Sequence, residues 1–222
     1  MIDKRVPNFD AIVADLPQLH DGAIITAGGF GDAGVPELLI DAVAGLKLRD
    51  LTVIANNAGS ERGGVGKLLR IGAVSKVICT FPRSSGSTIF EELHAAGKID
   101  LELVPQGTLA ERLRAGGAGI PGFYTATAVG TPLAEGKECR HFDGRDYLLE
   151  RAINPDVALV HAEQADRWGN LRFSKTARNF NPVMAMSANA TLAQVNRFVD
   201  RMDPEAVVTP GIFVTRVVEI NS

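Results

Sequence analysis

Short apolar runs alternate with helical patterns through the first half of the chain. The runs that predict strands are Ala23–Ala27, Leu51–Ala55, Lys76–Thr80 and Leu101–Val104. Helices are predicted between them from Pro36 through Val43, over Val65–Ile71, and after two segments with capping-box spacing, Thr88–Glu91 and Thr108–Glu111. The second of these helices is expected to stop at Gly116-Gly117. Strands that alternate with helices are typical of a parallel sheet with crossover helices.

The pattern changes in the second half. It contains a hairpin signal at Asp143-Gly144, a strong strand over Val157–Ala162, a turn at Trp168–Asn170, a helical segment over Pro182–Ala190 and a final strand over Ile212–Ile220. The segment Thr191–Val199 fits either a helix or a strand. The fold class is therefore α/β: a mostly parallel sheet with crossover helices, to which the second half adds mixed or antiparallel strands. No linker or repeat divides the chain, so residues 1–222 are expected to form a single domain.

Composition narrows the classes of partner. A hydrophobic content of 45% and a charged content of 22% are ordinary for a soluble globular protein. The net charge of −3 gives no reason to expect nucleic acid or a membrane as partner. No apolar run approaches the ~20 residues that span a bilayer, and the start of the chain lacks the apolar core of a signal peptide. We therefore expect a cytoplasmic protein.

The two cysteines do not suggest a disulfide or a metal site. Cys79 and Cys139 stand apart in the sequence, and no Cys/His cluster accompanies either of them. Cys79 lies within an apolar run and is expected to be a buried small side chain. No metal is predicted.

Each of the first four predicted strands is followed by a loop rich in Gly, Asn, Ser or Gln. These loops are Gly28–Gly34, Asn56–Gly59, Pro82–Ser87 and Pro105–Gly107. In a parallel sheet the carboxyl ends of the strands share one edge, and ligands bind in the crevice there. Any single loop could be only a tight turn, but together they predict one site. Its glycine backbone, amides and hydroxyls would bind carboxylates, phosphates or amide groups through neutral hydrogen bonds.

The first loop also fits the glycine spacing of a dinucleotide-binding loop. Gly29–Gly34 follows a predicted strand and opens a helix, whose amino terminus favours an anionic group. A nicotinamide cofactor additionally needs an acidic residue at the end of the second strand, and Asn56-Asn57 stands there instead. This argues against NAD. We expect Gly29 and Gly31 to reject bulky side chains because they need positive φ or close backbone approach.

No catalytic nucleophile is evident. The stretch Gly63–Lys67 is not a P-loop, because Glu61 takes the place of the first glycine and Leu68 that of the Ser/Thr. None of the four histidines lies near a serine or cysteine in a nucleophile-elbow pattern. Glu61 is the one acid inside a candidate site loop. A site without a nucleophile is what half of a shared active site would look like.

Several motifs resemble those of the family I (3-oxoacid) CoA-transferases. They are Asp21-Gly22, Ala27–Pro36, Asn56–Gly59, Pro105–Arg112, Gly116–Pro121, Glu135–Glu138, Trp168–Asn170 and Ala177–Phe180. Thr26 departs from the all-apolar strand that usually precedes the glycine loop. The match extends from about Asp21 to Val218, and the run Pro105–Pro121 is its most specific part.

The resemblance implies a covalent mechanism shared between two different chains. A glutamate of the B subunit, in a Ser-Glu-Asn-Gly type of motif, attacks the acyl-CoA thioester, and a glutamyl-CoA thioester follows a mixed anhydride. No Glu in this chain is followed by Asn. The chain is therefore expected to be the separate A subunit, not a fused enzyme, and to act in a heterodimer or heterotetramer. No cofactor is expected beyond coenzyme A as a substrate.

The resemblance also implies roles for individual residues. Gln106 would support oxyanion charge on the reacting carbonyl or carboxylate. The CoA site would include Ala27, Gly28, Gly29, Phe30, Gly31, Asp32 and Ala33. Substrate binding is assigned to Asn56, Asn57 and Arg83.

The substrate acid is a finer question. The segments Val77–Arg83 and Thr209–Val214 resemble the corresponding chains of 3-oxoadipate CoA-transferases more than those of acetoacetate CoA-transferases. Arg83, unless it is only a surface arginine, could bind the second carboxylate of a dicarboxylic acid. We therefore expect transfer of CoA from succinyl-CoA to 3-oxoadipate, with succinyl-CoA:acetoacetate transfer as the alternative. A nicotinamide-dependent oxidoreductase and a non-catalytic ligand sensor are the hypotheses from other classes.

Overall fold

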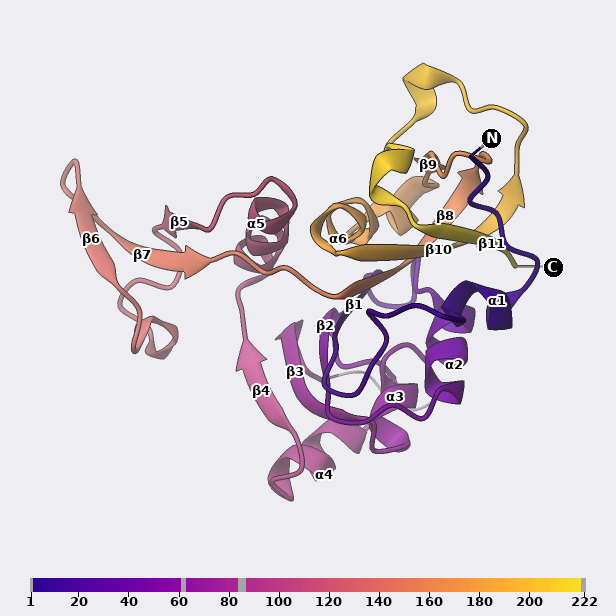
Figure 1. The fold of residues 1–222 in the computed structure, drawn as a ribbon. Coiled ribbons are helices and arrows are strands. Elements are labelled where there is room, and N and C mark those ends of the chain that lie inside the picture. Colours follow the sequence, from indigo (N-terminus) through magenta and orange to yellow (C-terminus); the bar gives the residue numbers. More distant parts are fainter. Residues whose placement is uncertain (1, 61–62, 84–86, 221–222) are drawn as a thin grey trace.

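The main sheet forms the centre of the molecule (Figure 1). The computed structural model describes residues 2–60, 63–83 and 87–220. In these ranges the sheet has the order β11 (Arg216–Glu219), β10 (Ala190–Phe198), β8 (Val157–Ala165), β1 (Ile24–Ala27), β2 (Leu51–Asn57), β3 (Val74–Phe81) and β4 (Asp100–Leu103). Neighbours along this path pair in parallel, and the short strand β9 (Leu171–Arg172) pairs antiparallel with β8.

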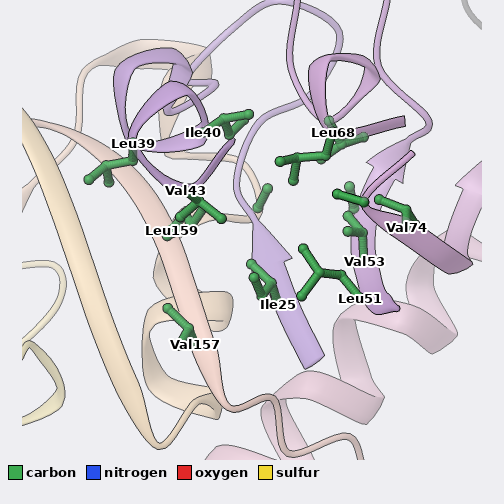
Figure 2. Close-up of a cluster of buried hydrophobic side chains, with 14 of the residues drawn as sticks. Ile25, Leu39, Ile40, Val43, Leu51, Val53, Leu68, Val74, Val157 and Leu159 are labelled. Carbon is green, nitrogen blue, oxygen red and sulfur yellow. The ribbon is translucent and has the colours of Figure 1, made fainter. Parts of the chain in front are cut away.

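Helices cover both faces of this sheet. They are α1 (Phe9–Val13), α2 (Glu37–Gly45), α3 (Gly66–Arg70), α4 (Ile89–Ala95), α5 (Gln106–Gly117) and α6 (Asn181–Ser187). Alternate residues of a strand face opposite sides, so Val53 joins the core beneath α1 to α4 while Ile54 joins the core beneath α5 and α6. Figure 2 shows the first of these cores, in which Leu39, Ile40 and Val43 of α2 pack over the strands. Burial of each such side chain contributes about 1.5–3 kcal/mol.

A small antiparallel sheet extends away from the main body (Figure 1). Its order is β5 (Gly122–Thr125), β7 (Arg145–Arg151) and β6 (Cys139–Phe142). The hairpin between β6 and β7 turns at Asp143 and Gly144, whose φ angles of 48° and 78° are those of a type I′ turn. The α/β prediction is thereby confirmed, including the antiparallel strands of the second half and this hairpin. Strand β5 was not predicted.

The last predicted helix and the last predicted strand end differently in the structure. The helix predicted over Pro182–Ala190 is Asn181–Ser187, and Ala190 already belongs to β10. The predicted strand Ile212–Ile220 is reduced to Arg216–Glu219, because a 3-10 turn occupies Gly211–Phe213. In this turn Gly211 N donates to Asn170 Oδ1 at 2.9 Å, and Lys4 Nζ donates to Gly211 O at 2.6 Å, so side chains replace strand partners. The segment 191–199, which the sequence left open, is strand β10 as far as Phe198.

Neither of the two predicted capping residues makes the predicted side-chain hydrogen bond to the backbone at the start of its helix. Helix α4 does follow Thr88, but Thr88 Oγ1 donates to Glu92 Oε1 at 2.7 Å and caps no backbone group. Helix α5 begins at Gln106, two residues before the predicted capping residue Thr108, which is buried inside its first turns. Gln106 is consequently the first residue of a helix and not part of a preceding loop. None of the helices in the described ranges is long and apolar enough to cross a membrane.

Candidate active site

A cavity of about 490 Å³ lies where the loops after β1, β2 and β3 meet the start of α5. Its walls include Ala27, Gly28, Gly29, Phe30, Gly31, Asp32, Val35, Glu37, Asn56, Asn57, Thr80, Phe81, Arg83 and Gln106. Strand β1 pairs with β2 on one side and with β8 on the other, so the sheet order reverses here. Ligands bind at such reversal points in open α/β sheets. The structure therefore brings the four predicted segments to one site, the first three as loops and the fourth as the start of α5.

The glycine loop Gly28–Gly34 forms one wall and is tightly confined. Gly29 has a φ of +118°, and a Cβ added there would lie 2.6 Å from Val35 Cγ2. Phe30 and Ala33 bond to each other through both backbone groups, at 3.1 Å each. Of the residues predicted to form the CoA site, only Ala33 is absent from the cavity wall. At Gly31 the expectation is met by the backbone conformation alone, because φ is +57° and an added Cβ would meet no atom within 4 Å.

A chain of hydrogen bonds joins the ends of β2, β3 and α5. Gln106 Nε2 donates to Asn56 Oδ1 at 2.9 Å, and Thr80 Oγ1 lies 3.0 Å from the same oxygen. Asn56 is buried, and no acceptor for its Nδ2 group is found in the described part of the chain. This arrangement leaves amide N–H donors of Asn56 and Gln106 available at the cavity wall. Asn57 Oδ1 accepts from Gly59 N at 2.9 Å, which ends β2 in a tight turn.

Arg83 and Phe81 form a much looser part of the wall. The Arg83 side chain is 77% exposed, and its Nε lies 3.8 Å from Glu91 Oε1. Phe81 is 61% exposed. Ion pairs with such exposure contribute little to stability, so Arg83 is free to move toward a ligand.

The comparison with known protein families gives a match over nearly the whole chain. A family model described as coenzyme A transferase matches residues 10–220. The chain belongs to the coenzyme A transferase family. Over its whole length it is 53% identical to the A subunit of 3-oxoadipate CoA-transferase from Acinetobacter baylyi, covering 97% of that protein. It is 52% identical over 90% of its length to the A subunit of a probable succinyl-CoA:3-ketoacid coenzyme A transferase from Bacillus subtilis, covering 84% of it.

Solved structures share the fold of this coenzyme A transferase. Glutaconate coenzyme A-transferase from Acidaminococcus fermentans superimposes with a TM-score of 0.82 at 22% identity, covering 97% of this chain and 75% of that one. An acyl-CoA transferase from Escherichia coli O157:H7 gives a TM-score of 0.82 at 24% identity, covering 99% of this chain and 47% of that one. The family assignment leaves the nicotinamide and sensor hypotheses without support.

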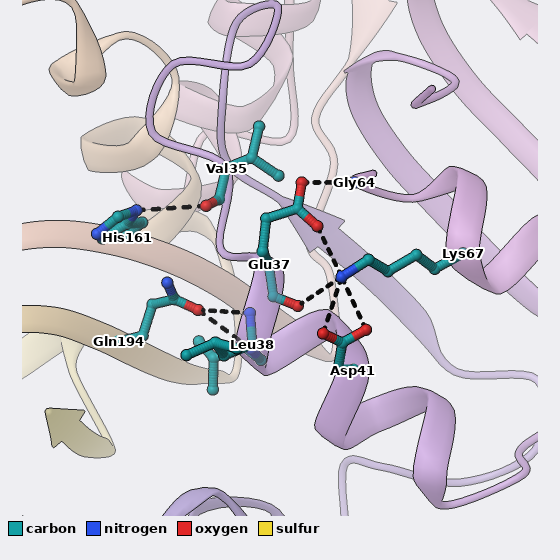
Figure 3. Close-up of polar contacts among 9 residues, drawn as sticks. Val35, Glu37, Leu38, Asp41, Gly64, Lys67, His161 and Gln194 are labelled. Atoms are coloured by element: carbon teal, nitrogen blue, oxygen red, sulfur yellow. Dashed lines mark hydrogen bonds and ion pairs between the residues drawn. The ribbon is translucent and has the colours of Figure 1, made fainter. Parts of the chain in front are cut away.

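Charged and polar groups tie the start of α2 to α3 and to the segment before it, beside the cavity (Figure 3). Glu37 Oε1 accepts from Gly64 N at 2.8 Å, and Lys67 Nζ lies 2.9 Å from Glu37 Oε2 and 2.8 Å from Asp41. Partial burial alone would lower the pKa of Lys67, but the two carboxylates raise it, so the ammonium stays charged. Glu37, although it lines the cavity, is thus committed to binding protein groups.

The amino terminus of α2 is also occupied by protein. Gln194 Oε1, from buried β10, accepts from Leu38 N and Leu39 N at 3.1 Å each. His161 Nδ1 lies 3.3 Å from Val35 O on the same side (Figure 3). The sequence suggested that this helix end favours an anionic group, but the capping amide already satisfies its first donors. At the start of α5, by contrast, no capping side chain is found among the described residues.

Neither of the two cysteines is placed to act as a nucleophile in the cavity. Burial raises the pKa of the Cys79 thiol to about 11, so it is protonated at neutral pH and unreactive. Cys139 is exposed on the small sheet. Glu61 lies outside the described residues. Among the residues that the structure does describe, no cluster of His, Cys, Asp or Glu could hold a metal ion.

Helix α5, which carries Gln106, is fixed by charged groups. Arg112 Nη1 donates to Glu102 Oε1 at 2.7 Å, and Lys76 Nζ donates to Glu102 Oε2 at 2.7 Å. Burial would raise the pKa of Glu102, but the two cations outweigh it and hold the pKa below its usual range. The carboxylate therefore stays ionised and ties α5 to β3 and β4.

Proposed function

We propose that this chain is the A subunit of a heteromeric CoA-transferase that moves CoA from succinyl-CoA to 3-oxoadipate. The observation that carries the proposal is a preformed cavity whose wall presents the amide donors of Asn56 and Gln106 and, among the residues that the structure describes, holds neither a cysteine nor a histidine. Such a cavity supports the interpretation that this chain provides one half of an active site that a second chain completes. The similarity over nearly full length to proteins that are named as A subunits agrees with this reading.

The nucleophilic glutamate is expected on a B subunit. Its carboxylate attacks the thioester carbonyl, CoA thiolate leaves, and an acyl-glutamyl anhydride forms. Attack of the thiolate on the glutamyl carbonyl then gives the glutamyl-CoA thioester and frees the donor acid. The acceptor carboxylate repeats the two steps in reverse, so no water or redox equivalent is consumed. No cofactor beyond coenzyme A as a substrate is needed.

Gln106 is the residue of this chain that we assign to oxyanion support. Each tetrahedral intermediate places negative charge on an oxygen, and a fixed amide donor stabilises that charge. The 2.9 Å bond to Asn56 Oδ1 uses one N–H of Gln106 and leaves the other for the substrate. The uncapped start of α5 adds partial positive charge at the same place.

The face around the cavity fits a covering partner. Phe30 and Phe81 line the cavity and are 51% and 61% exposed, which is unusual for side chains of this size. A B subunit that brings its glutamate to the cavity would cover them. A heterodimer or heterotetramer meets this requirement, and a cytoplasmic location suits both substrates.

Arg83 is the proposed contact for the acid. A dicarboxylic 3-oxo acid has one carboxylate for the reaction and a second for a cation, and Arg83 is the arginine that lines the cavity in the described part of the chain. Succinyl-CoA:acetoacetate transfer remains the second candidate, because the Bacillus subtilis relative named for 3-ketoacids is almost as similar as the 3-oxoadipate relatives.

An acceptor panel tests the assignment. The chain is co-expressed with a B subunit, the pair is purified, and succinyl-CoA-dependent transfer is measured with 3-oxoadipate, acetoacetate and a 3-oxo monoacid of matched length. The proposal predicts the highest kcat/KM for 3-oxoadipate. A higher kcat/KM for acetoacetate would select the second candidate.

A further inference from the structure

The segment that leads into α6 lies against the glycine loop, although about 150 residues separate the two in the chain. The 3-10 turn Lys175–Arg178 ends at Asn179, and α6 begins two residues later at Asn181. Asn179 Oδ1 accepts from Gly29 N at 3.2 Å, a contact between residues 150 apart. The glycine loop is therefore shaped from outside as well as by its own residues.

Both ends of the Asn179 amide are engaged. Its Oδ1 also accepts from Phe180 N at 2.6 Å, which fixes the side chain against its own backbone. Its Nδ2 donates to Ala33 O at 2.9 Å and to Thr176 O at 2.8 Å. One side chain thus ties the beginning of the glycine loop to its end.

Asn181 supports the same loop from beneath and is fully buried. Its Oδ1 accepts from His161 N at 3.0 Å, and its Nδ2 donates to Gly34 O at 3.0 Å. A Cβ on Gly28 would overlap Asn181 Oδ1, and one on Gly34 would lie 2.9 Å from Asn181 Nδ2. These two glycines are small because the asparagine occupies the space beside them.

The tether fixes donors at the loop tip. Within the described residues, the backbone N–H groups of Gly31 and Asp32 have no acceptor, and both residues line the cavity. The two hydrogen bonds from Asn179 bracket this tip, one at Gly29 and one at Ala33. Because the loop is held on both sides of its tip, the free N–H groups of Gly31 and Asp32 have fixed directions before any ligand binds.

We propose that Asn179 is a positioning residue for acyl-CoA binding, which it serves by holding the glycine loop in its binding geometry. The inference rests on the proposed function. It requires both the acceptor and the donor end of the amide. Aspartate has the same shape but would place a carboxylate oxygen against the Ala33 and Thr176 carbonyls, so it does not replace asparagine.

The test uses Asn179→Ala, Asn179→Asp and the matched control Asn189→Ala. Asn189 is exposed at the opposite edge of the sheet, and no side-chain hydrogen bond of it is found within the described ranges. Each full-length variant is paired with the B subunit, and steady-state kinetics are measured with acyl-CoA and acid varied separately. Hydrogen–deuterium exchange of peptides covering residues 28–34 is measured on the same samples.

Both Asn179 variants should raise the KM for acyl-CoA by about tenfold, the effect of losing one to two hydrogen bonds. The KM for the acid and the kcat at saturating acyl-CoA should stay within about twofold of wild type, and the loop should exchange faster. Asn189→Ala should change none of these. Wild-type behaviour of Asn179→Asp, or unchanged loop exchange in Asn179→Ala, would overturn the inference.

The exchange measurement separates this inference from the proposed function. If the wild-type pair transfers no CoA but Asn179→Ala still accelerates exchange of the loop, the tether stands and the proposed function fails. If the wild-type pair is active and both Asn179 variants match it in acyl-CoA KM, the positioning role fails and the function stands.

Discussion

Two parts of the cavity wall are held in very different ways. The fixed wall, which we define as Gly28–Asp32 with Asn56 and Gln106, is held by hydrogen bonds from distant segments at Gly29 N and Asn56 Oδ1, and by a further one at Ala33 O, directly after it. The open rim, which we define as Phe81 and Arg83, has side chains that are 61% and 77% exposed. Within the described residues the polar contact found for these side chains is a 3.8 Å ion pair from Arg83 to Glu91. One part is set before a ligand arrives, while the other can still adjust.

We infer from this difference that the fixed wall serves the chemical step and that the open rim serves selectivity for the acid. Groups that stabilise charge in a transition state must be placed in advance, because reorganisation during the reaction costs free energy. A group that recognises the variable end of an acid has no such requirement. We therefore expect changes that displace the fixed wall or remove one of its donors to affect every substrate, and changes in the open rim to affect particular acids.

The largest effect is expected for Gly29→Val. Gly29 has a φ of +118°, and a Cβ added there would lie only 2.6 Å from Val35 Cγ2. A branched side chain is therefore excluded both by the backbone conformation and by a clash with Val35. CoA transfer with every acceptor should be lost while the A/B complex still forms in size-exclusion chromatography. Near-normal kinetics would mean that the loop is only a turn.

The next effect is expected for Gln106→Ala, which removes one oxyanion donor. The kcat should fall on the order of 10²-fold, more than the KM rises. Gln106→Glu should be at least as harmful, because it places negative charge beside the reacting carboxylate. Steady-state kinetics of the reconstituted variants measure both parameters, and a raised KM with unchanged kcat would assign Gln106 to ground-state binding instead.

Arg83→Met is expected to act on one class of acid. Loss of a charge-assisted hydrogen bond should weaken the use of 3-oxoadipate by roughly 1.5–3 kcal/mol, while transfer to acetoacetate is spared. The ratio of the two kcat/KM values is the quantity to measure. Equal losses for both acids would remove the proposed selectivity of the open rim.

The smallest effect on activity is expected for Gly31→Ala. Its φ of +57° makes alanine cost about 1–2 kcal/mol of folding stability, but the added Cβ meets no atom within 4 Å. The strain is present before the ligand binds, so KM should change by less than about threefold. Gly72→Ala is the control, with a φ of +70° and open space outside the cavity, and denaturant unfolding should show a similar stability loss for both.

Much of the fold and the location of the site could be predicted from local sequence. Strands β1 to β4 follow from apolar runs, and the position of the cavity follows from the rule that parallel strands end at one edge. The local pattern was misleading where a residue could take either of two roles, a capping hydrogen bond or burial in the core. Thr108 has the spacing of a cap, but the helix begins at Gln106 and burial of Thr108 prevails.

The support of the site could not be predicted in the same way. Asn179 and Asn181 reach the glycine loop only because strand order places β8 beside β1. Likewise Gln194 caps a helix that lies about 150 residues earlier in the chain. Nothing in the spacing of these amides reveals their partners. The resemblance in Ala177–Phe180 pointed to the right segment but to no role for Asn179.

The most direct test of the central claim is the transferase activity of the purified chain with and without its B subunit. We predict no succinyl-CoA:3-oxoadipate transfer by the chain alone, and activity once the B subunit is added in equal amount. Substituting the glutamate of the partner's Ser-Glu-Asn-Gly type of motif should abolish that gain. Robust turnover by the isolated chain, with partner contamination excluded by mass spectrometry, would contradict the shared active site.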